Sequence, residues 1–523
     1  MNDALLRAYL ATDYSVETRP RIIIHVGVRS DALDAQLRLA GVTTWAYVAA
    51  VNPGSVLLRP HENEMRRAAL IQRVAAEGYV FVDGQATSRD PQSFEPEPSL
   101  WVLGISEGDA SALGREFGQY AVLVGQIGEA PRLVACNPTV AQSPLATAAI
   151  HAGEIHPKVQ RAAITPIFQS VVYEHEETGD DKTVLYPRYG NLPNHDVVHA
   201  RIATLEQADD AHVVASGMAA VTAAILASTR HGGRILMQRD LYGGTHAFAI
   251  HDLPAMGRSV TFVDAHDVAG FEKAMGPDVQ AIYVEAMSNP LSRVIDHEQV
   301  VAFARRNKLT SIIDSTFAPP VLWQPAKVGF DLVVHSATKF LNGHSDLTAG
   351  VVAGRRELMG KVRSLARRLG GSLDGLNVWL LERGMKTLPL RVERACDNAL
   401  RVAMALASHP NVTRVFHTGM PSHPDFDLAR RYFGGRSALL AFEVRGGGSA
   451  AAQCLERLRL IVHGPSLGGV ETLAVRPVTT SHRGVPIAER ESMGITDGLI
   501  RLAVGIECAD DIVKDLTNAL DAS

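Results

Sequence analysis

The sequence predicts an α/β fold, chiefly because short apolar runs alternate with helix-like segments from about Ala146 onward. This alternation is typical of a mostly parallel sheet with helices on both faces. The expected central strands are residues 235–237, 260–263, 281–284, 311–313 and 331–334. After Leu388 a long helix, Arg391–Ser408, precedes shorter strands and helices, which predicts a smaller C-terminal lobe. A chain of 523 residues is also too long for one ordinary hydrophobic core.

Residues 1–135 are expected to form a separate, small α/β unit without an obvious catalytic constellation. Its expected strands are Arg21–Val26, Trp45–Val51, Tyr79–Val82, Leu100–Ile105 and Ala121–Val124. Glu62–Ala76 carries apolar residues at helical spacing, and Ser88–Pro98, with three prolines, is expected to be a surface loop. Asn137–Pro144 has the composition of a linker, so we place the domain boundary at residues 136–147.

The composition, with 46% hydrophobic and 20% charged residues, is that of a soluble globular protein. The 51 basic and 56 acidic side chains give a net charge of −5, which argues against a nucleic-acid partner. Arg355–Arg368 contains six Lys or Arg residues, but its apolar residues recur at helical spacing, so we expect a solvated helix face. The four cysteines lack Cys-x-x-Cys spacing, so no zinc site, other metal or disulfide framework is expected.

Targeting and membrane signals are not expected in this chain. Met1–Arg7 lacks a basic start followed by an apolar core, so the cytoplasm is the expected location. Ala211–Ser228 comes nearest to a membrane span in length, but it is built of small residues and includes Ser216, Gly217 and Thr222. We therefore expect this segment to be a buried helix.

Lys339 is the residue with the most suggestive surroundings. It follows the apolar strand Asp331–Val334 and stands among Ser336, Thr338 and a turn at Gly343. A lysine that holds pyridoxal phosphate as a Schiff base must lose its proton, and the two hydroxyls can bind the adjacent phosphate. The alternative is a solvent-exposed loop lysine, and the short Ser-x-Thr-Lys string alone does not decide between them.

Two further segments could complete such a cofactor site. Ser216-Gly217-Met218 follows a strand-like pair of valines and opens an alanine-rich helix, whose first backbone N–H groups would face an anion such as phosphate. Asp314 ends an apolar run where open α/β sheets place ligand groups, and its carboxylate could keep a pyridine nitrogen protonated. Such helix starts are common in α/β proteins, however, and Asp314 could instead cap the next turn.

Tyr242 and Asn289 follow two other strand-like runs. Tyr242 precedes Gly243 and Gly244, which allow close backbone approach, so its ring could stack on a cofactor; the alternative is a core aromatic residue. Asn289 could hydrogen-bond the ring oxygen of the cofactor, although Asn-Pro is also an ordinary turn pair.

These segments occur in the order found in the trans-sulfuration family of pyridoxal-phosphate enzymes, and residues 148–520 resemble that family. The family contains cystathionine γ-synthase, cystathionine lyases, methionine γ-lyase and homoserine-ester sulfhydrylases. Further matching motifs are Tyr186–Asn191, Gly343–Asp346, Arg383–Leu388, Ser466–Leu473 and Arg501–Glu507. The resemblance implies fold type I, with an N-terminal arm over residues 148–200, a large cofactor domain over 201–390 and a C-terminal domain over 391–523.

The resemblance also implies a role for each matching residue. Lys339 is expected to form the Schiff base, and Tyr242 is expected to be the second catalytic residue. The expected cofactor-binding residues are Ser216, Gly217, Met218, Asn289, Asp314, Ser336 and Thr338, with Tyr186 and Arg188 reaching a neighbouring subunit's phosphate. Arg501 is expected to grip the substrate α-carboxylate, with Ser466 also in the substrate site. The active site would then need a homo-oligomer, a dimer of active-site-sharing subunits assembled into a tetramer.

The implied chemistry is elimination or replacement at the β or γ carbon of a sulfur-containing amino acid or an activated homoserine ester. Lys339 would remove the α-proton, and Tyr242 and Lys339 would pass further protons as a substituent leaves. Transamination is a second possibility. A third is a cofactor-binding regulatory or weakly active protein whose N-terminal unit carries the biological role.

Several positions depart from the better-known members of the family. Gly244 stands where bacterial methionine γ-lyases usually carry cysteine, and Pro465 where cystathionine γ-synthases and γ-lyases typically carry glutamate. Asn191–Asn194 interrupts the usual Asn-Pro-Thr, and Ala503 replaces a common serine. These departures remove no catalytic group, but together they match no single member, so the substrate stays open.

The N-terminal unit resembles an uncharacterised bacterial domain family whose name implies no activity. The resemblance rests on Asn52–Ser55, Glu62–Asn63, Glu97–Ser99 and Phe117–Gln119. These polar residues could line a ligand site. The sequence favours the other interpretation, in which Asn52 and the Glu62–Asn63 pair are turn and cap residues.

Overall fold

The computed structural model describes residues 9–52, 60–89, 96–119, 121–136, 145–174 and 184–522. The chain divides into two compact units, Met1–Ser143 with Ile155–Ala163, and Pro144–Glu154 with Ile164–Ser523. Of the predicted linker, residues 137–144 lie outside the described residues, while 145–147 begin helix α5 (Leu145–His151). The domain limits expected at residues 200 and 390 stay predictions.

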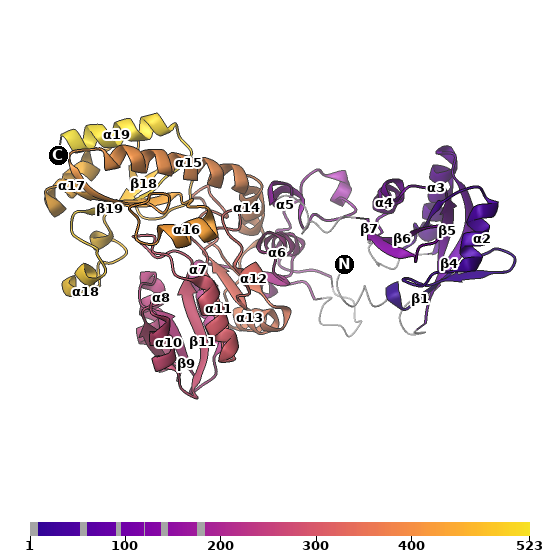
Figure 1. Cartoon of the computed structure of the whole chain (residues 1–523), viewed down its shortest axis with the longest axis horizontal. Helices are drawn as coiled ribbons and strands as arrows, with labels where there is room; N and C mark the ends of the chain where they lie inside the picture. Colours follow the sequence, from indigo (N-terminus) through magenta and orange to yellow (C-terminus); the bar gives the residue numbers. More distant parts are fainter. Residues whose placement is uncertain are drawn as a thin grey trace. The chain divides into compact units, whose positions relative to one another are not determined.

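In its described part, the first unit contains an antiparallel sheet with the strand order β2-β1-β4-β5-β3-β6-β7 (Figure 1). The strands are β1 (Thr12–Val16), β2 (Ile22–Ile24), β3 (Thr44–Ala49), β4 (Val80–Ser88), β5 (Glu97–Leu103), β6 (Ala121–Gln126) and β7 (Arg132–Ala135). The helices are α2 (Asp31–Leu39), α3 (Pro60–Ala76) and α4 (Glu107–Glu116). The five expected strands and the helix over 62–76 are confirmed, whereas the sequence patterns do not predict β1, β7, α2 or α4.

The expected loop over Ser88–Pro98 is shorter than predicted. Ser88 still belongs to β4, and Glu97 already begins β5, while residues 90–95 lie outside the described residues. Gln85 and Ala86 pair with Pro98 and Glu97 across the two strands, so the ladder extends to these ends.

Alternate side chains of β3 serve two different hydrophobic cores. Ala46 and Val48 pack with helices α3 and α4 on one face of the sheet. Trp45 and Tyr47 point to the opposite face, where α2 packs. Because side chains of a strand alternate between faces, this sheet is covered by helices on both sides, which confirms a small α/β unit.

The second unit also contains a seven-stranded sheet, with the strand order β10-β9-β11-β12-β13-β14-β8. Its strands are β8 (Asp210–Val214), β9 (Arg234–Gln238), β10 (Ser259–Val263), β11 (Val279–Glu285), β12 (Thr310–Asp314), β13 (Leu332–His335) and β14 (Gly350–Gly354). The ladder from β10 through β9, β11 and β12 to β13 is parallel, which confirms the mostly parallel sheet. The unpredicted β14 runs antiparallel to both of its neighbours.

Helices cover both faces of this mostly parallel sheet. They are α6 (Pro193–Glu206), α7 (Gly217–Ser228), α8 (Gly243–Ala247), η6 (Phe248–Asp252), α9 (Leu253–Ala255), α10 (Val268–Ala274), α11 (His297–Arg306), α12 (Pro325–Val328), α13 (Arg356–Leu369) and α14 (Gly375–Met385). One core packs α7 and α13 against the sheet, and a second packs α11 against the opposite face. The basic stretch 355–368 is α13, which buries Met359, Val362 and Ala366 and exposes most of its arginines, as expected.

The sequence predicts one buried helix over Ala211–Ser228, and this is wrong in part. Strand β8 runs to Val214, and α7 begins only at Gly217 because Ser216 caps it, its Oγ accepting a hydrogen bond from Ala219 N at 3.1 Å. In the described ranges, no helix has the length and apolar character needed to cross a membrane. No group of three or more His, Cys, Asp or Glu residues in those ranges could hold a metal ion.

The C-terminal lobe of the second unit has the strand order β15-β16-β19-β18-β17. The strands are β15 (Val412–Phe416), β16 (Leu439–Val444), β17 (Val462–His463), β18 (Leu473–Val475) and β19 (Leu499–Ala503). The helices are α15 (Leu388–Ala407), α16 (Phe426–Phe433), α17 (Gly447–Arg457), α18 (Ile487–Ser492) and α19 (Ala509–Asp521). Helices α15 and α19 lie side by side and share a core with this sheet (Figure 1), so the long helix and smaller lobe are confirmed.

The buried Arg391, in the first turn of α15, ties this helix to the turn after β13. Its Nη1 donates a hydrogen bond to Phe340 O at 2.8 Å, and its Nη2 donates to Gly384 O at 2.8 Å. Gly343, with φ +74°, leaves the space that the guanidinium occupies, since a Cβ there would collide with Arg391 Nη1. The guanidinium therefore fixes the turn that carries Lys339.

We expect Arg391→Lys to lower the free energy of unfolding by about 1–3 kcal/mol, because an ammonium group cannot satisfy the buried carbonyls that the planar guanidinium bridges. Chemical denaturation of the protein without cofactor measures this. The matched control is Arg401→Lys, at an exposed arginine paired with Asp510, which should change the value by less than about 0.5 kcal/mol. Equal losses in the two variants would contradict the role given to Arg391.

Candidate active site

Lys339 lies in the turn after β13, and its Nζ donates a hydrogen bond to Ser466 Oγ at 2.8 Å. Burial, with a smaller contribution from the Arg501 cation, lowers the pKa of Lys339 to about 8. A substantial fraction of the amine is therefore neutral near physiological pH, as attack on a carbonyl carbon requires. The amine is held inside the protein and does not extend into solvent as an ordinary loop lysine would.

Arg501, on β19, is a buried cation held by neutral groups. Its Nη1 donates to Asn289 Oδ1 at 3.1 Å and its Nη2 to Ser466 O at 2.8 Å. Among the described residues no carboxylate pairs with it, and its Nε has no hydrogen-bond partner. Burial lowers the pKa of Arg501 to about 10. Since an unpaired buried charge is costly, this guanidinium suits an anionic ligand such as a carboxylate.

Ser466 joins these two cations, because its hydroxyl accepts from Lys339 and its carbonyl accepts from Arg501. Its φ of +105° lies in a region that residues with a Cβ rarely adopt. Backbone strain of this kind persists where surrounding contacts hold it, and it is concentrated at ligand sites. The sequence carries no sign of this conformation.

Asp314 ends β12 and lies beside Glu285 of β11 in the parallel register. Its Oδ1 accepts from Thr316 N at 2.9 Å and its Oδ2 from Tyr283 OH at 3.2 Å. Burial raises the pKa of Asp314, whereas these two hydrogen bonds favour its charged form. The carboxylate is thus oriented by fixed donors, as the partner of a cationic ring nitrogen would need to be.

Tyr242 precedes the first residue of α8, and the residue is 49% exposed. Its backbone N–H donates to Glu285 Oε1 at 2.6 Å. A Cβ on Gly244 would lie 2.6 Å from Tyr242 Cε1 and 3.0 Å from Met218 Sδ, so the ring and Met218 meet at this glycine. A side chain at position 244 would therefore displace the ring.

The expected phosphate-binding residues meet where α7 begins. A Cβ on Gly217 would lie 2.8 Å from Ser336 Cβ, so the helix start and the turn after β13 approach closely. The hydroxyls of Ser216 and Thr338 already have backbone partners, Ala219 N and Ala349. Within the described ranges the hydroxyl of Ser336 makes no such bond, so this hydroxyl and the first N–H groups of α7 are available to an anion.

Tyr186 and Arg188 lie apart from this group, at the one-turn helix η5 (Pro187–Tyr189). The Arg188 guanidinium stacks 5.6 Å from the Tyr186 ring centre and 5.2 Å from that of Tyr189. Its Nη1 also donates to Arg367 O at 3.3 Å. Both Tyr186 and Arg188 are exposed, and no hydrogen bond between described residues links them to Lys339 or its neighbours.

Sequence reasoning missed Glu285, Tyr283 and Thr316, which hold Tyr242 and Asp314. Glu285 is the acid that ends an apolar run, just as Asp314 does, so the same signal could have identified it. Tyr283 reads as a core residue and Thr316 as a turn residue, and only the three-dimensional fold reveals their hydrogen bonds.

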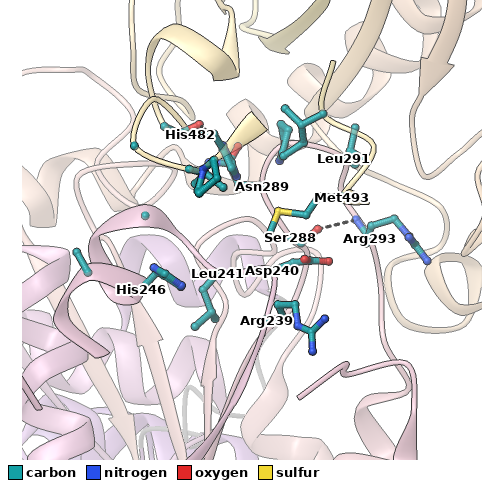
Figure 2. Close-up of a pocket in the computed structure, with 18 of the residues that line it drawn as sticks. Arg239, Asp240, Leu241, His246, Ser288, Asn289, Leu291, Arg293, His482 and Met493 are labelled. Carbon is teal, nitrogen blue, oxygen red and sulfur yellow. Dashed lines mark hydrogen bonds between the residues drawn. The ribbon is translucent and has the colours of Figure 1, made fainter. Parts of the chain in front are cut away.

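A cavity of about 460 Å³ lies next to this group and shares Asn289 with it (Figure 2). Its wall comes from residues 239–251 after β9, residues 288–293 after β11 and residues 481–495 of the C-terminal lobe. The buried His482 lines it, with Nδ1 2.9 Å from Ser481 Oγ. Burial, Arg501 and Arg490 lower the pKa of His482 to about 4, so this imidazole is neutral at physiological pH.

The donor set fits pyridoxal phosphate. The amine of Lys339, the carboxylate of Asp314, the start of α7 and the cation of Arg501 gather where the parallel strands end, the edge at which open α/β sheets bind ligands. A Cβ at Gly217 would fill the space between the helix start and Ser336. No side chain at position 217 therefore separates the first turn of α7 from Ser336.

Comparison with known proteins agrees with this geometry. The family described as "Cys/Met metabolism PLP-dependent enzyme" matches residues 146–521, and "Protein of unknown function (DUF3293)" matches residues 48–122. An L-methionine gamma-lyase from Fusobacterium nucleatum subsp. polymorphum is 36% identical over 388 residues, 72% of this chain and 98% of that protein. A cystathionine beta-lyase from Coxiella burnetii is 36% identical over 385 residues, with coverages of 72% and 98%.

A third relative, chloroplastic cystathionine gamma-synthase 1 from Arabidopsis thaliana, is 36% identical over 384 residues, 71% of this chain and 68% of that protein. Among solved structures, cystathionine gamma-lyase from Lactobacillus plantarum complexed with L-serine is 35% identical, with a TM-score of 0.68 over 72% of this chain and 98% of that chain. The predicted family, fold class, enzyme class and cofactor are thereby confirmed. This chain belongs to the Cys/Met metabolism family of PLP-dependent enzymes and carries a DUF3293 segment near its N-terminus.

Proposed function

We propose that this protein catalyses elimination or replacement at the β or γ carbon of a sulfur-containing amino acid or an activated homoserine ester. The chain of contacts from Lys339 through Ser466 to Arg501 carries this proposal. It sets a nucleophilic amine beside a buried cation that lacks a carboxylate partner in the described part of the chain. Such a pair suits a substrate whose carboxylate is bound while its α-carbon reacts.

Each residue has a distinct task in this reaction. When bound, pyridoxal phosphate supplies an electron sink for the pair released at the substrate α-carbon. Lys339 Nζ would hold the cofactor and, once the substrate amine has displaced it, the freed amine would remove the α-proton, while Arg501 would bind the α-carboxylate through its guanidinium. Asp314 keeps the ring nitrogen protonated, and Tyr242 covers the ring and moves protons as the substituent leaves. Gly217 and the other residues at the start of α7 bind the phosphate with Ser336.

The substrate class rests on the relatives. The relatives are named for methionine and cystathionine, which both contain a carbon–sulfur bond. A thioether or thiol amino acid, or an ester that yields one, is the proposed substrate.

We also propose that the enzyme acts as a homo-oligomer in the cytoplasm, a dimer of active-site-sharing subunits within a tetramer. The extended segment before α6 exposes four large apolar side chains, Ile164, Ile167, Val171 and Val172, at 44–82% of their surfaces. Exposed apolar residues gathered on one segment are typical of a subunit contact. Tyr186 and Arg188 follow that segment, also exposed, which supports their assignment to a neighbouring subunit's phosphate.

The cofactor assignment is tested by visible absorption. We expect purified protein to show the band of a lysine-bound pyridoxal phosphate and to release a keto acid from at least one of cystathionine, methionine, cysteine and acylated homoserines. Lys339→Ala should lose the band and lower turnover by at least about 10³-fold, because the Lys339 amine both holds the cofactor and removes the α-proton. The control Lys361→Ala, at an exposed lysine of α13, should change neither. A wild-type band without any keto acid would favour the regulatory alternative.

The lowered pKa of Lys339 predicts a pH dependence for cofactor capture. Only the neutral amine attacks the aldehyde, so the capture rate of the protein without cofactor should rise about tenfold per pH unit and level off above a pH of about 8. Removing the neighbouring cation in Arg501→Met should raise the midpoint, since that charge disfavours the protonated amine. Stopped-flow absorption measures both profiles, and a downward shift in the variant would refute this account.

The shared active site predicts that Arg188→Ala weakens cofactor retention by about tenfold or more, because a cationic partner of the phosphate is removed from the neighbouring subunit. Dialysis followed by absorption measures retention, and sedimentation gives the oligomeric state. Arg368→Ala, at another exposed arginine, is the control. A fully active monomer would exclude the shared site.

A further inference from the structure

Glu285, the last residue of β11, joins three parts of the candidate site. Its Oε1 accepts the backbone N–H of Tyr242 at 2.6 Å, and its own N–H donates to Gln238 Oε1 at 3.0 Å. In the parallel ladder it lies beside Asp314 of β12. Glu285 is only 5% exposed, so this acid is buried between the turn that carries Tyr242 and the residue assigned to the ring nitrogen.

The turn that carries Tyr242 is anchored before this residue by Leu241, which is buried in the core, and by Gln238 Nε2, which donates to Asp240 O at 3.0 Å. Its neighbours Leu241 and Gly243 line the 460 Å³ cavity, so one side of the turn faces open space (Figure 2). Tyr242 itself is half-exposed. The Tyr242 carbonyl accepts from His246 N at 2.9 Å, but that bond only starts α8 and moves with it. Among the described residues, the bond to Glu285 is therefore the hydrogen bond that ties the Tyr242 backbone itself to the sheet.

Two carboxyl groups side by side in a buried place do not both ionise readily, because the charges repel in a weakly polar medium. Asp314 accepts two hydrogen bonds, from Thr316 N and Tyr283 OH, which favour its charged form. Burial raises the pKa of Glu285 well above its usual range, and the charges of Asp314 and Asp240 raise it further, against a smaller opposite effect of the Tyr242 N–H. The negative charge belongs on Asp314 and the proton on Glu285.

We propose that Glu285 is a positioning residue, an uncharged carboxylic acid that holds the backbone of Tyr242 in place and leaves the charge at the ring nitrogen to Asp314. The proposal rests on the function given above for Tyr242 and Asp314. A glutamate is suited to this task because one oxygen accepts from an amide while the protonated group adds no second charge beside Asp314.

The test compares Glu285→Gln with Glu285→Ala. Glutamine keeps a carbonyl acceptor and no charge, so we expect wild-type turnover within about twofold and an unchanged pH midpoint of the visible band. Alanine removes the acceptor, so turnover should fall by about tenfold or more with cofactor content retained. Hydrogen exchange at the Tyr242 amide, measured without cofactor, should become at least about tenfold faster in Glu285→Ala only.

Asp240→Asn is the matched control, since it removes a nearby acid that has no part in the Tyr242 bond. It should leave amide exchange unchanged. A shift of the band midpoint in Glu285→Gln would show that the wild-type carboxyl is charged, and unchanged exchange in Glu285→Ala would show that it does not hold the turn; either overturns the proposal. Amide exchange needs no catalysis, so it separates this failure from failure of the proposed function. If Glu285→Ala does not fold, Glu285→Asp, with a shortened reach, should show the faster exchange instead.

Discussion

One buried cation, Arg501, joins the two lobes of the second unit at the candidate site. Arg501 of β19 reaches Asn289, after β11, and holds the carbonyl of Ser466, whose hydroxyl accepts from Lys339. A buried guanidinium without a carboxylate partner is unfavourable, so this site favours the binding of an anionic ligand. The same cation contributes to the lowered pKa of Lys339, so the group that would bind the substrate also prepares the amine.

The parallel sheet explains why these groups gather. The chain leaves β9, β11, β12 and β13 at the same edge, and the residues at or just after these ends are Tyr242, Glu285, Asp314 and Lys339. Each strand is buried on both faces, so its ends are the places where a polar side chain can face a ligand. Asp314 and Glu285 end neighbouring strands, which brings two acids together in a buried place where both do not ionise readily.

The sequence predicts the strands well because buried parallel strands read as continuous apolar runs, as in residues 281–284 and 311–313. The sequence does not predict β14, because Gly350 and Gly354 at its ends are typical of loops, although the strand is fully buried. Helix α4, with two glycines and a serine, has low helix propensity and forms because Ala110 and Leu113 pack into a core.

The candidate site likewise contains residues that the sequence predicts and contacts that it does not. Lys339, Asp314 and Tyr242 follow apolar strands and can be found by pattern, since position in the chain sets their place at the sheet edge. The contact between Ser466 and Lys339 spans 127 residues and depends on how the lobes pack, and the pairing of Glu285 with Asp314 depends on strand register. Local sequence contains neither piece of information.

The polar residues Asn52, Asn63 and Glu97 of the N-terminal unit differ from those of the candidate active site, because they hydrogen-bond to one another. Asn63 Oδ1 accepts from Asn52 N at 3.0 Å, Asn63 Nδ2 donates to Asn52 Oδ1 at 2.8 Å, and Asn52 Nδ2 donates to Glu97 Oε1 at 2.9 Å. Asn52 has φ +48°, a left-handed conformation that asparagine tolerates better than most residues. These bonds hold the end of β3 against α3 and β5, which favours the turn-and-cap interpretation of these residues over a ligand site.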